Sequence, residues 1–262
     1  MKSVRHDRHA RTQFIRRFSD SSSHLVTTYI LVHGAWHGAW CWDKVSPLLA
    51  AAGHTSVAVD LPGHDRNTST FRDITLDDYV NSVSQLLADL TEPVVLVGHS
   101  HGGATISMAA ERQPEMISTL VYVCAFLLHD GQSIADVVAA GEQSIVKRNM
   151  VSTDVGHRIM IREEACREGL FNDCSDAEYK WALSQLVPEP SSPRTTPVKL
   201  TEERFGRVRR TYIECLKDNA IPISVQRKMC ATLPCERVIR MNTSHSPFIS
   251  SPQELASHLL AI

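Results

Sequence analysis

The stretch GHSHGG, residues 98–103, places a serine between glycines directly after the apolar run PVVLV. A G-x-S-x-G turn between a strand and a helix lifts the serine hydroxyl clear of the sheet, where it can act as a nucleophile. The glycines lack a Cβ, so the chain can reverse tightly, and the next backbone N–H, that of His101, can face a bound carbonyl. Ser100 is therefore the candidate nucleophile of an acyl-transfer reaction.

A serine in a glycine-rich turn can also bind phosphate or have no chemical role. The dinucleotide-binding fingerprint G-x-G-x-x-G is absent from the sequence, which excludes one form of phosphate site. The apolar strand before Ser100 and the helical pattern of small residues after it favour the catalytic interpretation.

A second oxyanion donor is expected from the loop after an earlier strand. The sequence LVHGAWHGAW supplies that loop, and Ala35, which follows Gly34, is the predicted donor. His33 and His37 in the same loop have the spacing of a metal-binding pair. A zinc site normally needs a third ligand and a regular helix to hold such a pair, so we assign the loop to the oxyanion hole.

The general base is sought among the histidines after Ser100, because the acid and then the histidine follow the serine along the chain in this arrangement. His245 lies just after a predicted late strand, whereas His258 lies within the last predicted helix. One helix and one strand separate Asp218 from His245, so both side chains can emerge at the same sheet edge. Asp130, which follows an earlier strand, is the alternative acid.

Apolar runs alternate with helical patterns through the first half of the chain and return near its end. The predicted strands lie within residues 28–34, 55–64, 93–100, 118–126, 210–216 and 236–242, and the predicted helices within 42–53, 75–90, 102–113, 224–233 and 251–262. Strands that are apolar on both faces and alternate with helices are typical of a parallel sheet covered on both sides. We therefore predict an α/β fold with a mostly parallel sheet.

The alternation stops near Leu127. Residues 128 to about 205 contain short helical patterns such as DAEYKWALSQL and the proline-rich stretch VPEPSSPRTTPV, which predict a mostly helical cap insertion. Aromatic and apolar side chains in this insertion and in the oxyanion loop are candidates for an apolar pocket over Ser100, although each one singly could merely pack the insertion onto the sheet. The candidate pocket residues are Trp36, Phe171, Tyr179, Trp181 and Leu186.

The composition is 43% hydrophobic and 21% charged with a formal charge of −2. These values are ordinary for a globular protein and give no reason to expect a nucleic-acid partner. No apolar run approaches the roughly 18 residues of a membrane span. The seven cysteines are odd in number and form no CxxC pair, which indicates a reducing compartment and a cytoplasmic protein.

Residues 1–27 are basic and rich in serine, and they lack the apolar core of a secretory signal. The Arg and Ser bias also fits an organelle transit peptide, so targeting stays an alternative. We predict a disordered extension ahead of one domain over residues 28–262.

Five motifs in order along the chain resemble the α/β-hydrolase superfamily: VHGAWHGAWCW, VDLPGHDRN, LVGHSHGG, LTEERFGRVRRTYIECLKDNAIPISVQRKM and SHSPFISSP. They are similar to the branch that holds plant methylesterases, hydroxynitrile lyases and bacterial carboxylesterases of the pyrethroid-hydrolase kind. The resemblance implies an α/β-hydrolase fold, a Ser100–Asp218–His245 triad and oxyanion donors at Ala35 and His101. It implies no cofactor, and many members of the branch form homodimers. His101 departs from the pattern, because this position is usually apolar.

The predicted function is a serine carboxylic-ester hydrolase that acts through an acyl-enzyme on a small hydrophobic or aromatic ester. A methyl ester, a lactone or an ester of a polyketide-like metabolite would be compatible. Two alternatives are a hydroxynitrile-lyase-type C–C lyase and a small-molecule receptor that hardly turns over. The lyases of this branch carry a threonine where this chain has Gly34 and a lysine where it has Ser246, and an intact triad counts against a receptor. Ser100 argues against enzymes with an aspartate nucleophile.

Overall fold

The computed structural model describes residues 26–64, 73–141, 144–153 and 157–262. All but the last two residues of the predicted extension, residues 1–27, lie outside this part of the chain. Six strands form the main sheet in the order β2-β1-β3-β4-β8-β9, and every neighbouring pair is parallel. Their bounds are β1 Thr28–Val32, β2 Thr55–Val59, β3 Val94–His99, β4 Ile117–Val123, β8 Arg210–Cys215 and β9 Arg237–Met241. The predicted α/β fold with a parallel sheet is confirmed.

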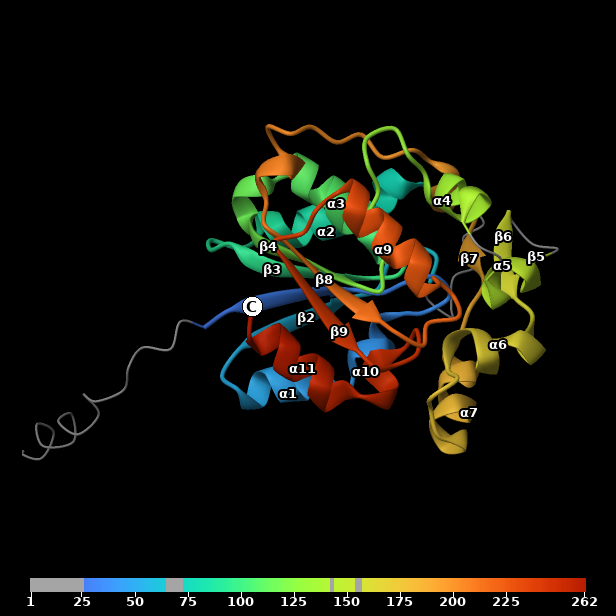
Figure 1. Ribbon diagram of the computed structural model, residues 1–262. Coiled ribbons are helices and arrows are strands. Elements are labelled where there is room, and N and C mark those ends of the chain that lie inside the picture. The colour runs from blue at the N-terminus through green and yellow to red at the C-terminus, as the bar shows by residue number, and fades with distance from the viewer. Residues whose placement is uncertain (1–25, 65–72, 142–143, 154–156) are drawn as a thin grey trace, which may run out of the picture.

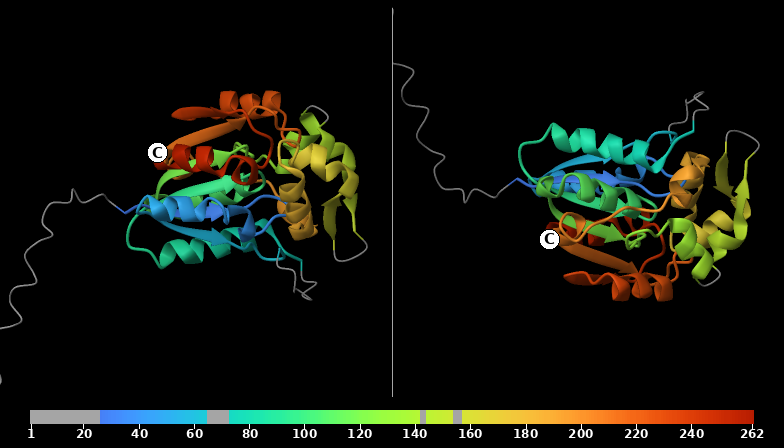
Figure 2. Two further views of the ribbon diagram at one scale, coloured as in Figure 1. Left: turned by 90° about the horizontal axis from the view of Figure 1, so that it is seen from below. Right: turned by 90° about the horizontal axis from the view of Figure 1, so that it is seen from above.

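Helices cover both faces of this sheet (Figures 1 and 2). One face carries α2, α3 and α9, and the other carries α1, α10 and α11. Their bounds are α1 Ser46–Ala51, α2 Leu76–Ala88, α3 Gly102–Arg112, α9 Ile223–Thr232, α10 Pro247–Ser250 and α11 Pro252–Leu260, with short 3-10 turns at Ala39–Trp42, Pro114–Met116 and Phe205–Arg207.

Successive side chains of the central strands enter two different cores. In β1, Ile30 packs into the core under α2 and α3, while Leu31 packs into the core under α1 and α11. Because alternate side chains of a strand point to opposite faces, a strand between two helical layers must be apolar at every position. This requirement explains the uninterrupted apolar runs in the sequence.

Helix α2 begins where the sequence predicts it. Thr75 accepts a hydrogen bond from the backbone N–H of Asp78, and the Asp78 carboxylate accepts one from the N–H of Thr75. This reciprocal pair satisfies two of the helix's free N–H donors. Its buried face, which includes Tyr79, Val83 and Leu87, lies against the sheet.

Most of the segment between β4 and β8, which we call the inserted segment, lies at one end of the main sheet, and its last part runs back along α3 (Figure 1). It contains α4 Ile134–Ala140, α5 Ile145–Asn149, α6 Glu163–Leu170, α7 Asp176–Gln185 and α8 Ser192–Thr195. It also contains a second sheet that the sequence patterns do not predict, with antiparallel strands β5 Met150–Ser152, β6 Arg158–Ile161 and β7 Glu189–Pro190. These strands are too short to show a two-residue hydrophobic period.

The order of the strands reverses between β1 and β3, since β1 leads to β2 on one side while β3 lies on the other. In open α/β sheets the crevice beyond the carboxyl ends of the strands at such a point is where ligands bind. The loops after β1 and β3 diverge here, and the inserted segment lies over this end of the sheet.

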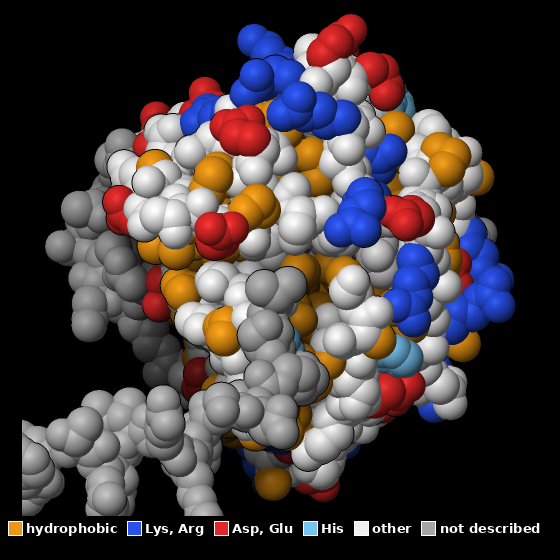
Figure 3. All heavy atoms as spheres, turned by 90° about the vertical axis from the view of Figure 1, so that its left-hand side faces the viewer, with side chains coloured by type: hydrophobic (Ala, Val, Ile, Leu, Met, Phe, Trp, Pro, Cys, Tyr) orange, Lys and Arg blue, Asp and Glu red, His pale blue; other side chains and the backbone are white. Residues whose placement is uncertain are grey.

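The opposite end of the molecule carries basic, acidic and apolar side chains intermingled on its surface (Figure 3). Among the described residues, no helix combines the length and the apolar character that crossing a bilayer requires.

Candidate active site

Ser100 stands in strained backbone at the turn from β3 to α3. Its φ is +51°, in the left-handed region that residues other than glycine rarely adopt. The turn is held on both sides, because Ser100 N–H donates to the Val123 carbonyl at 3.3 Å and Phe126 N–H donates to the Ser100 carbonyl at 3.0 Å. Strain of this kind persists only where the surroundings enforce it and is frequent at functional sites.

The two glycines that flank Ser100 at a distance of two residues are required by close backbone approaches. A Cβ on Gly98 would lie 2.8 Å from the Gly102 carbonyl oxygen, and a Cβ on Gly102 would lie 2.8 Å from the His33 carbonyl oxygen. Both obstacles are backbone atoms, which cannot rotate away. The G-x-S-x-G spacing therefore follows from sterics at the turn.

Two backbone N–H groups lie beside Ser100 without a partner. Ala35 follows β1, and His101 is the N-cap residue of α3. Both line the same pocket as Ser100, and within the described part of the chain neither N–H donates a hydrogen bond. Two unused donors at a pocket wall and the start of an eleven-residue helix can stabilise a developing oxyanion.

Asp218 and His245 meet at the ends of β8 and β9. His245 Nδ1 and Asp218 Oδ2 are 2.7 Å apart, and both side chains are buried. The Asp218 carboxylate also accepts hydrogen bonds from the N–H groups of Ala220 at 2.7 Å and Ile221 at 2.9 Å and from the Gln226 amide at 3.3 Å. These donors fix the carboxylate so that it accepts the Nδ1 proton of His245.

The loop that carries His245 is held by residues that the sequence patterns do not identify. His99 Nε2 donates to the His245 carbonyl at 2.8 Å. Asp173, from the inserted segment, accepts from Ser244 N–H at 2.7 Å and from the Ser250 hydroxyl at 3.2 Å. Aspartates in loops are common, so no spacing singles out Asp173.

Neutral histidines surround the oxyanion loop. Burial lowers the pKa of His33 to about 4 and that of His37 to about 3. His33 uses both ring nitrogens, since Nδ1 donates to the Gly34 carbonyl at 2.9 Å and Nε2 accepts from Leu61 N–H at 3.1 Å. His33 and His37 therefore support the loop and leave no free pair of nitrogens for a metal ion.

One group of described residues, His99, Cys124 and His245, brings three ligating atoms within 4.8 Å of one another. His99 Nε2 and Cys124 Sγ both donate to the His245 carbonyl, and His245 Nδ1 faces Asp218. Burial also raises the pKa of the Cys124 thiol well above its ordinary value, whereas metal binding needs the thiolate. The group does not fit a metal site.

The alternative acid, Asp130, lies elsewhere. Its carboxylate accepts a hydrogen bond from Leu200 N–H at 2.8 Å, so it fastens the end of the inserted segment. His258 lies in α11, with Nε2 3.8 Å from a Glu254 oxygen on the surface.

The pocket at Ser100 is narrow, with a volume of about 30 Å³. Trp36 lines it, and its indole N–H donates to the Ile159 carbonyl of β6 at 3.1 Å. Phe171 is fully buried, with its ring centroid 5.9 Å from that of His37. The other candidates, Tyr179, Trp181 and Leu186, lie outside the lining as well. Instead, Arg167 stacks over Tyr179, Trp181 packs edge-on against Trp40, and Leu186 packs at the border of the core that holds Phe171.

Charged side chains are the unexpected feature of this pocket. Arg194 and Lys147 line it. The His101 imidazole extends away from its N–H toward the inserted segment, where Nδ1 lies 3.2 Å from the buried Glu189 carboxylate of β7. The polar residue after the nucleophile thus has a buried polar partner in the inserted segment.

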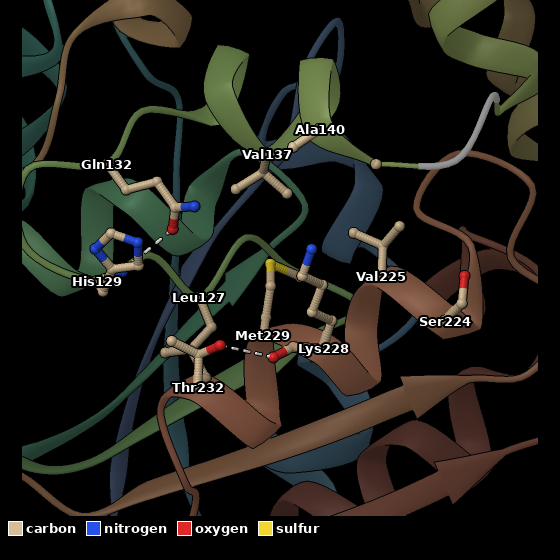
Figure 4. A pocket seen from close by; sticks show the side chains of 11 residues that line it. Leu127, His129, Gln132, Val137, Ala140, Ser224, Val225, Lys228, Met229 and Thr232 are labelled. Atoms are coloured by element: carbon tan, nitrogen blue, oxygen red, sulfur yellow. Dashed lines mark hydrogen bonds between the residues drawn. The ribbon is translucent and has the colours of Figure 1, made fainter.

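A wider cavity of about 470 Å³ lies between α4 and α9 (Figure 4). Val137 from α4 and Val225 and Met229 from α9 point into it. A third, small cavity shares Val137 and Val225 with the wide cavity. It shares other residues, among them Phe126, with the pocket at Ser100. We call the two larger spaces the outer cavity and the nucleophile pocket.

Comparisons with known proteins agree with this arrangement. Residues 29–258 match the sequence profile of the alpha/beta hydrolase family. The chain is 38% identical over 256 residues to putative methylesterase 14, chloroplastic, of Arabidopsis thaliana, covering 92% of this chain and 73% of that protein.

Two solved structures are also similar. The structure of a pyrethroid hydrolase from Sphingobium faniae JZ-2 superposes with a TM-score of 0.82 at 31% identity, covering 90% of this chain and 96% of that one. That of polyneuridine aldehyde esterase superposes with a TM-score of 0.81 at 26% identity, covering 90% and 98%. With the fold, the serine turn and the profile in agreement, this chain belongs to the alpha/beta hydrolase family.

Proposed function

We propose that this protein is a serine carboxylic-ester hydrolase in which Ser100 is the nucleophile, His245 the general base and Asp218 the residue that orients the base. One observation carries the proposal. His245, which lies 2.7 Å from Asp218, lines the same pocket as Ser100 with its strained backbone. The names of the relatives, methylesterase, pyrethroid hydrolase and esterase, support ester hydrolysis.

The reaction begins when His245 Nε2 accepts the proton of the Ser100 hydroxyl while Oγ attacks the ester carbonyl carbon. Within the described residues Ser100 Oγ and His245 form no hydrogen bond, and such contacts often tighten only when substrate binds. The N–H groups of Ala35 and His101 stabilise the tetrahedral oxyanion. The intermediate expels the alcohol, which takes the proton from His245, and leaves Ser100 acylated.

Water completes the cycle. His245 removes a proton from a water molecule that attacks the acyl carbon, and collapse of the second tetrahedral intermediate returns the proton to Ser100 and releases the acid. Asp218 keeps Nδ1 protonated throughout, so that Nε2 is free to act as the base.

The inserted segment supplies the substrate-binding cover in this proposal, with the cap over residues 128 to about 205. The nucleophile pocket, at about 30 Å³, admits the reacting ester group, and the outer cavity takes the larger part of the substrate. A methyl ester or another small-molecule ester is compatible with this division. The name of the chloroplastic relative fits the organelle-targeting alternative for residues 1–27, whereas a cytoplasmic location stays a prediction.

The lyase alternative meets a steric obstacle. A Cβ at Gly34 would lie 2.6 Å from Ser100 Cβ, so the threonine of the lyases requires a different loop position. Ser246, where the lyases carry a lysine, is fully buried.

Covalent labelling tests the proposal. A fluorophosphonate reacts with activated serine hydroxyls, and intact-mass spectrometry should show one adduct that peptide mapping places on Ser100. Ser100→Ala should stay unlabelled, and Ser107→Ala, which changes a buried serine bonded to Tyr122, should label like the native chain. A native chain that stays unlabelled, or an adduct on another serine, would contradict the assignment.

A further inference from the structure

The charged lining of the nucleophile pocket is of one sign. Among the described residues that line it, Arg194 and Lys147 carry charge, and no aspartate or glutamate is present. Both share this lining with Ser100 and His245. In a pocket shielded from water, such charges act more strongly than on the surface, so an anionic group is favoured next to the reacting ester.

Among the residues that the structure describes, Arg194 has no hydrogen-bond or ion-pair partner. Its Nε atom is buried and makes no hydrogen bond, and within the described part of the chain no carboxylate oxygen lies within 4.0 Å of its guanidinium. A guanidinium is a fork of donors that matches a carboxylate, and leaving a buried donor unsatisfied is unfavourable. The acceptor that Arg194 lacks can enter from the pocket.

Glu189 is the nearby carboxylate that could serve Arg194 instead. One of its oxygens faces His101 Nδ1 at 3.2 Å, and the other is buried without a partner. Burial lowers the pKa of the Arg194 guanidinium, and the attraction of Glu189 partly offsets this effect. Glu189 therefore acts on Arg194 from a distance, without an ion pair, and leaves the Arg194 Nε donor unused.

Lys147 contributes a second positive charge from α5. Its ammonium group donates to the Ala139 carbonyl at 3.3 Å at the end of α4. An ammonium has three donors, so two remain for other acceptors.

We propose that this protein is selective for esters that carry a carboxylate in addition to the ester group, and that Arg194 binds this carboxylate while Lys147 adds attraction. The inference rests on the proposed ester hydrolysis, because it assumes that the ester lies at Ser100. The carboxylate is unchanged in the reaction, in which water splits the ester bond into an acid and an alcohol.

Chain-matched esters test the selectivity. Monomethyl esters of dicarboxylic acids from succinate to suberate place the carboxylate on the acyl side, and acetate esters of ω-hydroxy acids place it on the alcohol side. Methyl hexanoate and dimethyl adipate are neutral controls. At the best chain length, kcat/KM for an anionic ester should exceed that of its neutral match by about 10- to 100-fold, the range of a hydrogen bond to a charged group. If the neutral ester is preferred at every chain length, both in the series with the carboxylate on the acyl side and in the series with it on the alcohol side, the proposal is overturned.

Arg194→Gln should remove most of this preference, so that the ratio of kcat/KM for the anionic and neutral esters falls about tenfold or more. Arg194→Lys keeps the charge without the fork and should lie between the two. The control is Arg167→Gln, which removes a cation that pairs with Asp176 on the surface and should leave the ratio as in the native chain. An unchanged ratio in Arg194→Gln would also overturn the proposal.

Glu189→Gln separates ligand binding from an internal ion pair. If Arg194 binds substrate, removing the competing carboxylate should raise the preference for anionic esters. If Arg194 serves only to balance Glu189, Arg194→Gln and Glu189→Gln should each lower the melting temperature and leave the preference unchanged, which contradicts the proposal.

Binding to Ser100→Ala keeps this test independent of turnover. Calorimetry should show monomethyl adipate binding about tenfold or more tightly than dimethyl adipate, and Arg194→Gln in the same background should abolish the difference. If the native chain hydrolyses no ester but this difference in binding is found, the proposed function fails and the carboxylate site stands. If neutral esters are hydrolysed and no difference in binding is found, the proposed function stands and the carboxylate site fails.

Discussion

The nucleophile pocket and the outer cavity differ in how they are built. The nucleophile pocket is formed around loops that follow parallel strands, with Ala35 after β1, Ser100 after β3 and His245 after β9. The outer cavity is formed mainly by α4 and α9 and is more than ten times larger, at about 470 Å³ against about 30 Å³. Ser100 and His245 line the smaller space and not the larger one. The candidate catalytic side chains are positioned by the ends of strands, whereas helices form the larger cavity.

The largest expected effect concerns the nucleophile pocket. Asp218→Asn keeps the size of the side chain but replaces one carboxylate oxygen by an NH₂ group. This NH₂ group must face either the backbone N–H groups that donate to Asp218 in the native chain or His245 Nδ1. In the second case the imidazole holds its proton on Nε2, and kcat should fall about 10⁴-fold. Hydrolysis of p-nitrophenyl butyrate measures this, with circular dichroism to verify the fold.

Asp130→Asn is the matched control, because among the described residues the Asp130 carboxylate accepts a hydrogen bond only from Leu200 N–H. It should retain the native kcat. An Asp218→Asn protein with a tenth of native activity would show that Asp218 does not orient the base.

The second effect concerns stability at acidic pH. Unfolded histidines titrate near pH 6.5, whereas His33 in the folded chain has a pKa of about 4 and His37 of about 3. The unfolded state therefore binds more protons as the pH falls below 6.5, and stability is lost from there down to the folded pKa values. His33 alone should lower the free energy of unfolding by about 3 kcal/mol at pH 4.

Urea denaturation between pH 8 and pH 4 measures this loss. The part between pH 6.5 and pH 5 reports mainly on histidines, because carboxylates titrate lower. His129→Gln, which removes an exposed histidine, should leave the curve unchanged. A free energy of unfolding that stays constant from pH 6.5 to pH 5 would mean that these histidines are not buried and neutral.

A third effect concerns the backbone at the nucleophile turn. Gly102→Ala places a Cβ against the backbone oxygens of His33 at 2.8 Å and Val32 at 2.9 Å, so it should destabilise the fold by about 1–3 kcal/mol. A Cβ at Gly169 in α6 would meet only side-chain atoms, of which the nearest belongs to Val146 at 3.1 Å. Gly169→Ala should be neutral or stabilising, because alanine favours a helix. Thermal unfolding compares the two, and equal melting temperatures would contradict the crowding at the turn.

The smallest effect tests the outer cavity. Val225→Trp places an indole in it, so the ratio of kcat/KM for a naphthyl ester over p-nitrophenyl acetate should fall about threefold to tenfold. Val238→Trp, at an exposed valine of β9, should leave the ratio unchanged. If Val225→Trp leaves it unchanged too, substrates do not reach the outer cavity.

The sequence predicts the parts of the molecule where local patterns and global fold agree. Continuous apolar runs identify β1, β3 and β4, which are covered on both faces. The edge strand β9 is recognised from a shorter run and also carries exposed residues, among them Val238. The glycines around Ser100 identify the turn because only a residue without a Cβ fits there. Asp218 and His245 follow from their places after late strands, and the structure brings their side chains into contact.

The pocket could not be predicted in the same way. Phe171 and Trp181 belong to the inserted segment as expected. Whether an aromatic side chain faces a pocket or a core depends on tertiary packing, which the hydrophobic period of the sequence does not reveal. Arg194 and Glu189 lie in the proline-rich stretch VPEPSSPRTTPV, where no repeating hydrophobic pattern indicates which way a side chain points. Glu189 is placed beside His101 by strand β7, which is two residues long, and Arg194 reaches the pocket of Ser100 from the four-residue helix α8.

Acylation of Ser100 can be measured as the burst of p-nitrophenol released from p-nitrophenyl acetate, in the native chain and in Ser100→Ala. We expect a burst close to one equivalent per native chain and none in Ser100→Ala. Equal rates without a burst in both proteins would contradict acylation of Ser100.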